Sequence, residues 1–337
     1  LIPRILVFAG RQFSLDRRLR KYLPELEARL EAFGSADLSA ADEKAIQESI
    51  HAMRALMYEV EYHHILAYAL LGLHQNTLKA LLKRRGLDPA RFDVSAEALG
   101  RYTPTAGLAS LHRAYRALSP DDQALVANGD LAALSSSATA APFVEAFQAF
   151  LRRFWHLRDR SADLSLPCWA ETPELVLATI ANQNDDAVPA IERPTFQEEG
   201  HTVAMVARRT QVYRVHRDAL GFYYSWMSGL LRQRLLLLGD RLVRRGLLDT
   251  ADDIFYLYMN EIEALTAAAE PTLDARALTK QRRDEMAAVE HVPLPSVIYG
   301  EAPALQPAEC AALLKGLGTS TGAHTGRVRQ VSSVRDL

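Results

Sequence analysis

Two arginines and an aspartate stand at helical spacing near the middle of the stretch 201–262, namely Arg214, Arg217 and Asp218. On a helix, Arg214 and Asp218 are four residues apart and share a face. The simplest interpretation is a solvated ion pair, which contributes about 0.3–0.5 kcal/mol. Gly221, one turn after Arg217, leaves room for another backbone or a ligand to approach. From the residues alone, the solvated pair is the favoured interpretation.

A second group of polar residues crowds the short segment 156–163, where the charged side chains His156, Arg158 and Asp163 lie. Charged groups between helices are usually solvated. Here Trp155 and Trp169 bracket the segment, and we expect them to hold it against the body of the protein. A loop held in this way is a reasonable place for contacts with an anion or a substrate.

Two Glu-x-x-His pairs suggest a third kind of chemistry: Glu61 with His64, and Glu198 with His201. A carboxylate-bridged di-metal bundle uses two such pairs together with one Glu from each of two further helices. The pattern is short and built from common residues. A partly buried polar pair in a helical core explains Glu61 and His64 more simply, and first-turn positions of a long helix explain Glu198 and His201.

The glycines near the end of the chain, Gly318, Gly322 and Gly326, form no nucleotide-binding motif. No Gly-Lys-Ser/Thr follows them, as a phosphate-binding loop requires, and no helical pattern follows, as a dinucleotide fingerprint requires. The alternation of β-branched and polar residues after these glycines predicts a turn and a strand.

One very long helix must position the central residues. No proline interrupts 203–245, and apolar residues recur there at helical spacing until Arg245 and Gly246 provide a stop signal. At 1.5 Å per residue the helix would be about 65 Å long, so other helices must pack against it. We predict these at 13–34, 43–73, 77–85, 107–118, 125–134, 141–155, 175–180 and 265–290. The segment 125–134 follows a capped helix start at Ser119, and Pro271 breaks the stretch 265–290.

Composition restricts the class of protein. The 337 residues carry a net charge of −2, which gives no case for a nucleic-acid surface or an anionic membrane. The longest apolar run, 65–73, is too short to span a bilayer. Cys168 and Cys310 lack metal-ligand spacing and are expected to be reduced thiols of a cytoplasmic protein. The absence of an initiator Met predicts a processed chain or a piece of a longer one.

The order of these pieces resembles a known family. The segment HLRDRSADLSLPCWAETPELVLATI precedes a long helix with an Arg-acid pair, and GDRLVRRGLLDTADDIFYLYMNEI and GTSTGAHTGRVRQV follow. This order is similar to the central and late part of the phosphoenolpyruvate synthase-like, three-domain dikinases, especially the rifampicin phosphotransferase and prodigiosin-ligase type. The resemblance covers roughly residues 110 to 330, and DDIFYL and the Gly-Thr-Ser-x-Gly start are its most specific parts.

The resemblance implies a relay of a phosphoryl group. In the family an ATP-grasp domain phosphorylates a histidine on a swivelling domain, which then visits a helical substrate-binding domain. ATP and Mg²⁺ would be bound outside this chain, and the partners would be the ATP-grasp and swivelling domains of the same polypeptide and a small substrate. An Arg-Glu pair of the family corresponds to Arg217 and Asp218, and Gly221 stands where the phosphotransferases carry a basic residue.

The roles that the resemblance implies follow general chemistry. Arg217 would neutralise charge on the moving phosphoryl group, and Asp218 would orient or deprotonate an acceptor hydroxyl. The implied substrate-binding residues are His156, Arg158, Asp163, Tyr213, His216 and Tyr224. Tyrosines at this spacing are more often part of a core than of a pocket.

We therefore predict a mainly α-helical protein built around one long helix, with a short β segment at the C-terminus. Residues 1–300 would form a helical substrate-binding domain, and 301–337 a linker and the first strand of an α/β swivelling domain. Its function would be to present a small, aromatic or apolar molecule for ATP-derived phosphoryl transfer or ligation. We expect no metal bound by this chain, no nucleic acid and no membrane. The alternatives are a stand-alone helical binding or scaffold protein and a di-metal carboxylate oxidase.

Overall fold

A computed structural model describes residues 14–87, 94, 96–159, 163–183, 200–268 and 271–289. The chain divides into two compact units, residues 1–235 with 330–337, and residues 236–329. Every regular element in the described ranges is helical, which confirms the prediction of a mainly α protein. The predicted C-terminal strand and the domain 301–337 lie outside the described residues.

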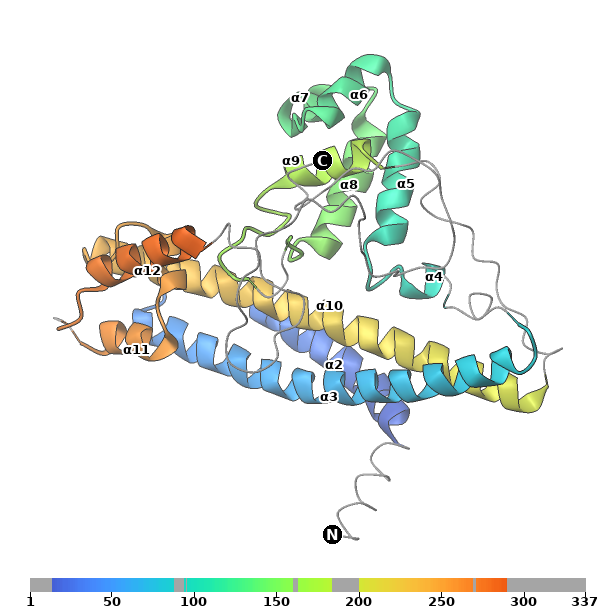
Figure 1. The fold of residues 1–337 in the computed structure, drawn as a ribbon. Coiled ribbons are helices and arrows are strands. Elements are labelled where there is room, and N and C mark those ends of the chain that lie inside the picture. The colour runs from blue at the N-terminus through green and yellow to red at the C-terminus, as the bar shows by residue number, and fades with distance from the viewer. Residues whose placement is uncertain are drawn as a thin grey trace, which may run out of the picture. The chain divides into compact units, whose positions relative to one another are not determined.

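Three long helices in the first unit lie side by side (Figure 1), namely α2 (Leu15–Ser35), α3 (Glu43–Lys83) and α10 (His201–Arg244). Leucines at helical spacing form the buried face of α2, and all are at most 7% exposed: Leu15, Leu19, Leu23, Leu26 and Leu30. The end of α3 packs on the start of α10 through Leu78, Leu82 and Val203. The long helix predicted from the absence of proline is therefore present with its expected bounds.

The structure corrects the prediction that separate helices cover 43–73 and 77–85. A single helix, α3, runs through both segments. The Thr77 hydroxyl donates to the carbonyl oxygen of Leu73 at 2.8 Å, one turn earlier in the same helix. Polar residues at 74–77 therefore continue the helix, because no proline or left-handed glycine is present there to end it.

Shorter helices complete the first unit: α4 (Ala96–Leu99), α5 (Thr105–Arg116), α6 (Pro120–Ala127), α7 (Leu131–Ser136), α8 (Ala141–Phe154) and α9 (Pro173–Ala181). The capped start predicted at Ser119 is confirmed, because its hydroxyl accepts from the Asp122 amide, but the predicted continuation 125–134 is not a single helix. Helix α6 ends before Gly129 and α7 begins after it. The φ of Gly129, +71°, lies in the left-handed region. Phenylalanines on one side of α8 are buried: Phe143, Phe147, Phe150 and Phe154.

The second unit contains the end of α10, a 3₁₀ helix η3 (Ala251–Tyr256), α11 (Met259–Ala267) and α12 (Ala275–Val289). The break predicted at Pro271 within the helical stretch 265–290 separates α11 from α12, and α11 starts earlier than predicted. Gly246, with φ +75°, ends the long helix as its sequence predicted. The guanidinium of Arg282 binds the Glu261 carboxylate through contacts of 2.6 and 2.8 Å, which joins α12 to α11.

Candidate functional site

The carboxylate of Asp218 is held by two arginines of its own helix. Nε of Arg214 donates to Oδ2 at 3.0 Å, and Nη2 of Arg217 lies 2.7 Å from Oδ1. The Asp218 side chain is only 9% exposed, whereas those of Arg214 and Arg217 are 32% and 28% exposed. The cluster is therefore shielded at the carboxylate and accessible at the cations, which differs from the solvated pair that the spacing alone favoured.

Helix α3 supplies a histidine to the same cluster. The ring of His64 comes within 3.9 Å of the place where a side chain would begin at Gly221. Burial lowers the pKa of His64, and the charge of Arg217 lowers it further, so the ring is neutral at pH 7. A neutral imidazole beside the Arg217 guanidinium can accept a proton from a reacting group. Sequence reasoning considered His64 only together with Glu61, as a metal ligand or as a partly buried polar residue of the core. Its position beside Gly221 was not predicted, because it depends on the packing of α3 on α10.

Tyr224 lies on the flank of this cluster. It is partly buried, and burial raises the pKa of its hydroxyl, as does the negative charge of Glu61 on α3. The hydroxyl therefore stays protonated at neutral pH and can donate a hydrogen bond. Glu61, His64 and Tyr224 thus share the interface of α3 and α10 with Arg217.

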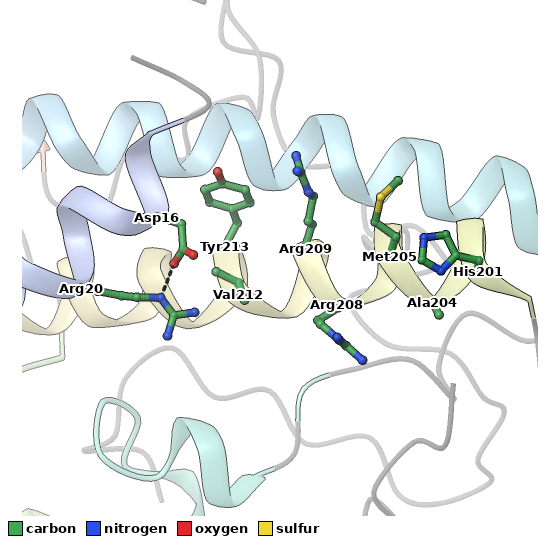
Figure 2. A pocket seen from close by; sticks show the side chains of 9 residues that line it. All are labelled: Asp16, Arg20, His201, Ala204, Met205, Arg208, Arg209, Val212 and Tyr213. Atoms are coloured by element: carbon green, nitrogen blue, oxygen red, sulfur yellow. Dashed lines mark hydrogen bonds and ion pairs between the residues drawn. The ribbon is translucent and has the colours of Figure 1, made fainter. Parts of the chain in front are cut away.

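Tyr213 and His216 point to other neighbours. The ring of Tyr213 stacks on His74 of α3, with ring centroids 5.4 Å apart. Nε2 of His216 lies 2.7 Å from Oδ1 of Asp16, the second residue of α2. Tyr213 and Asp16 line the same pocket, as Figure 2 shows. These two predicted residues therefore face α2 and α3 rather than the Asp218 carboxylate.

The segment after α8 is buried against the helices. His156 is 0% exposed, and its Nδ1 lies 3.1 Å from the Ser225 hydroxyl. Burial lowers the pKa of His156 to about 3, and the charges of Arg153 and Arg158 add to this effect. Ser225 is eight residues beyond Arg217, which is about 12 Å along α10. His156 therefore lies at a different level of the long helix from the Asp218 cluster.

Arg158 and Asp163 stabilise the fold of that segment. Arg158 is 6% exposed, and it donates to the Asp163 carbonyl oxygen and to Sγ of Cys168, both at 3.3 Å. The Asp163 carboxylate accepts from the Ser165 backbone amide at 3.0 Å and from its hydroxyl at 2.6 Å. Their predicted contact with a substrate stays a prediction.

A buried arginine that sequence reasoning missed anchors the same segment. Arg232 is 5% exposed and binds both carboxylate oxygens of Glu171, through contacts of 3.0–3.2 Å. It also donates to the carbonyl oxygens of Leu164 and Ser165. The available signal was an arginine within the leucine-rich run 230–238, because such a residue must find partners when the run is buried.

A hollow of about 640 Å³ lies beside this segment, with Trp155, Trp226, Leu151 and Leu230 among its lining residues. Trp226 follows Arg217 by nine residues, which places it on the opposite face of the helix. Neither this hollow nor the pocket of Tyr213 is lined by Arg217 or Asp218. The predicted site residues are thus divided among three places around α10.

Metal ligands do not cluster in the described ranges. Within residues 14–289, apart from the gaps named above, no three His, Cys, Asp or Glu side chains are placed to hold a metal ion. Glu198, one member of the second Glu-x-x-His pair, lies outside these ranges. In the same ranges no helix has both the length and the apolar character needed to cross a bilayer.

Comparison with known proteins defines the family. Residues 64–234 match the family described as the rifampicin phosphotransferase fourth domain, and this match covers about half of the chain. The chain therefore belongs to this family and to the wider group of phosphoenolpyruvate synthase-like proteins. The matched segment begins at His64 and includes every site residue predicted from the sequence.

Longer relatives occur in mycobacteria. The uncharacterized proteins Rv2047c of Mycobacterium tuberculosis and Mb2073c of Mycobacterium bovis are each 32% identical to this chain over 207 residues. The aligned segment is 59% of this chain and 23% of each relative. The chain thus spans about a quarter of the length of the curated relatives that it matches.

Proposed function

We propose that this helical domain receives a phosphoryl group from a phosphohistidine on a separate domain and directs it to a small aromatic or apolar molecule. The observation that carries the proposal is the Asp218 cluster, in which one shielded carboxylate orients two partly exposed guanidiniums. The cluster lies within the segment that matches a phosphotransferase family.

The transfer breaks the N–P bond of the phosphohistidine and forms an O–P bond with a hydroxyl of the acceptor. The bonding electrons of the N–P bond return to the carrier imidazole, and the hydroxyl proton must leave the acceptor. The charge on the moving phosphoryl group is spread over its oxygens, so that a positioned guanidinium stabilises the transition state. Arg217 fits this role because Nη2 is fixed on Asp218 while its side chain stays 28% exposed.

We assign proton acceptance to His64 and orientation to Asp218. Both carboxylate oxygens of Asp218 already interact with arginines, at 2.7 and 3.0 Å, so this carboxylate is placed to orient the two guanidiniums. His64 is neutral at pH 7 and stands beside Gly221, the position at which the phosphotransferases carry a basic residue. A ring nitrogen there can take the proton of the attacking hydroxyl.

ATP and Mg²⁺ belong, in this proposal, to a nucleotide-binding domain of the same polypeptide, and a swivelling domain carries the phosphohistidine. More than three quarters of each mycobacterial relative lies outside the aligned segment, which leaves room for such domains in those proteins. Rifampicin, which appears in the family's name, is the first acceptor to test. Transfer that activates a carboxylate for condensation would be the ligase form of the same chemistry.

The test uses the longest native polypeptide that contains this chain and ATP labelled in its β- and γ-phosphates. We expect an acid-labile phosphohistidine to form, and rifampicin or another hydroxylated aromatic compound to discharge it. The variant Arg217→Ala should still form the labelled histidine but should fail to discharge it. If ATP gives no labelled protein, the relay is absent and a helical binding protein is the better description.

A further inference from the structure

A pocket of about 390 Å³ lies along the first half of α10, where α2 begins (Figure 2). Its volume is at the lower end of the range for small-molecule sites, which is about 300–1,000 Å³. Four basic residues are among those that line it: Arg20 of α2, and His201, Arg208 and Arg209 of α10. Three of these four residues are arginines, so the cavity wall carries positive charge.

Asp16, the acid among the described residues that line the pocket, already has partners. Oδ1 of Asp16 accepts from Nε of Arg20 at 2.9 Å and from Nε2 of His216 at 2.7 Å. Burial raises the pKa of Asp16, but the hydrogen bonds from His216 and Arg20 outweigh it and hold the pKa below its ordinary value. Asp16 is therefore ionised at pH 7 and offsets one of the arginines.

The positive charges of Arg208 and Arg209 are not balanced by Asp16. Both side chains are exposed, and no side chain in the described ranges forms an ion pair with either of them. Figure 2 shows them leaving α10 in different directions from consecutive positions. An anion in the pocket would gain charge-assisted hydrogen bonds from groups that the described part of the protein does not use.

The remaining wall is apolar. Tyr213 is buried and fixed by its stacking on His74, and Val212 lies beside it. Met205, another lining residue, is 46% exposed, so its apolar side chain is accessible to a ligand in the pocket. A ligand with an apolar body would cover Met205 and contact the Tyr213 ring.

We propose that this pocket binds a small organic anion, one acidic group on an aromatic or apolar body. Arg209 holds the acidic group on the face that it shares with Met205 and Tyr213, which contact the body. Arg208, on the other side of the helix, adds a second positive charge at the pocket. Arg209 precedes Arg217 by eight residues, or about 12 Å along α10, so the pocket is a separate site from the Asp218 cluster. The proposal stands whether or not phosphoryl transfer occurs at that cluster.

The experiment compares two fluorescent probes with the same type of body. The anion 8-anilino-1-naphthalenesulfonate carries the charge that the site requires, and the neutral N-phenyl-1-naphthylamine lacks it. Each is titrated into the full chain, into Arg208→Gln/Arg209→Gln, and into the control Arg17→Gln/Arg244→Gln. The control removes the same charge from exposed arginines that do not line the pocket.

We expect the double variant to weaken binding of the anionic probe by about tenfold or more and to leave the neutral probe unchanged. The control should bind both probes like the wild type. Because all four arginines are exposed, circular dichroism should show unchanged helix content in both variants. Equal affinity of the double variant and the control for the anion would overturn the proposal, as would an equal loss for both probes.

Discussion

Arg217 and Asp218 are neighbours in the chain and also an ion pair, with Nη2 of the arginine 2.7 Å from Oδ1 of the aspartate. Consecutive residues on a helix point about 100° apart, so a side-chain contact between them requires the long arginine to bend back. Arg214 binds the other carboxylate oxygen from one turn away, at 3.0 Å. The cluster thereby fixes the direction of the Arg217 guanidinium.

Removal of Arg217 tests whether this fixed guanidinium acts in transfer. Arg217→Ala should slow discharge of the phosphohistidine by about 10²–10³-fold, because it removes one donor to the transition-state charge. Asp218→Asn should cause a smaller loss, since the guanidinium remains but is less well oriented. Single-turnover discharge with rifampicin measures both. Rates equal to the wild type in Arg217→Ala would remove this residue from the site.

His64 gives a prediction that depends on pH. Its pKa lies below the ordinary 6.5 through burial and the charge of Arg217, and a base acts only when it is deprotonated. The discharge rate should therefore stay level as pH falls to 6.5 and decline only below it. This decline is the acid limb of the pH–rate profile. His64→Gln should slow discharge by about 10²-fold and abolish the acid limb.

The neighbouring histidine provides the control for that experiment. His63 stacks on Tyr22 of α2, with ring centroids 4.7 Å apart, and so belongs to the other flank of α3. His63→Gln should keep both the rate and the acid limb. If the limb survives in His64→Gln, another group titrates, and His64 is not the proton acceptor.

Periodicity predicted the long helix because continuity and termination are local properties. An unbroken apolar pattern without proline specified α10, and Arg245 with Gly246 specified its end. The continuity of α3 was not predicted, because the polar residues 74–76 interrupt the apolar pattern between the predicted helices 43–73 and 77–85. The stacking of His74 on Tyr213 of α10 is a tertiary contact that sequence patterns do not encode.

In the candidate site, too, contacts within one helix could be predicted from the sequence, whereas contacts between helices could not. The pairing of Arg214 with Asp218 follows from a four-residue spacing and was predicted. The contact of His216 with Asp16 joins residues 200 positions apart, and helical spacing carries no information about it. His64 beside Gly221 is likewise a tertiary contact. Sequence spacing therefore identified only those members of the Asp218 cluster that lie on the same helix.

Burial of His156 should make the free energy of unfolding depend on pH. Its pKa is about 3 in the folded protein and about 6.5 when unfolded, so the unfolded state binds more protons between these values. Stability should therefore rise with pH across this range, by up to about 1.4 kcal/mol per pH unit. Relative to His156→Gln, the wild type should lose about 2 kcal/mol between pH 7 and pH 5.

Urea titrations at the two pH values measure this difference directly. Glutamine can still form a hydrogen bond with the Ser225 hydroxyl but does not titrate. The comparison therefore measures the effect of protonating His156 on the free energy of unfolding. Other histidines contribute equally to both proteins and cancel. An identical pH dependence in wild type and variant would mean that His156 is accessible to protons in the folded state.

Two glycines of α10 should respond to alanine in opposite directions. A Cβ at Gly229 would lie 2.8 Å from Cβ of His156 and 3.0 Å from the ring of Trp155, closer than packing allows. Gly229→Ala should therefore destabilise the fold by about 1–3 kcal/mol, because the segment after α8 must shift. At Gly221 the nearest atoms are those of the His64 ring at 3.9 Å, an ordinary contact distance.

Gly221→Ala should consequently stabilise the protein by about 0.5–1 kcal/mol, the gain in helix propensity from glycine to alanine. Both positions lie in the same helix and both changes add one methyl group, so each variant controls for the other. Urea unfolding of the two variants and the wild type gives the sign of the change in the free energy of unfolding for each variant. A loss of stability in both would mean that His64 packs more tightly on Gly221 than 3.9 Å implies, and that the space beside Arg217 is closed.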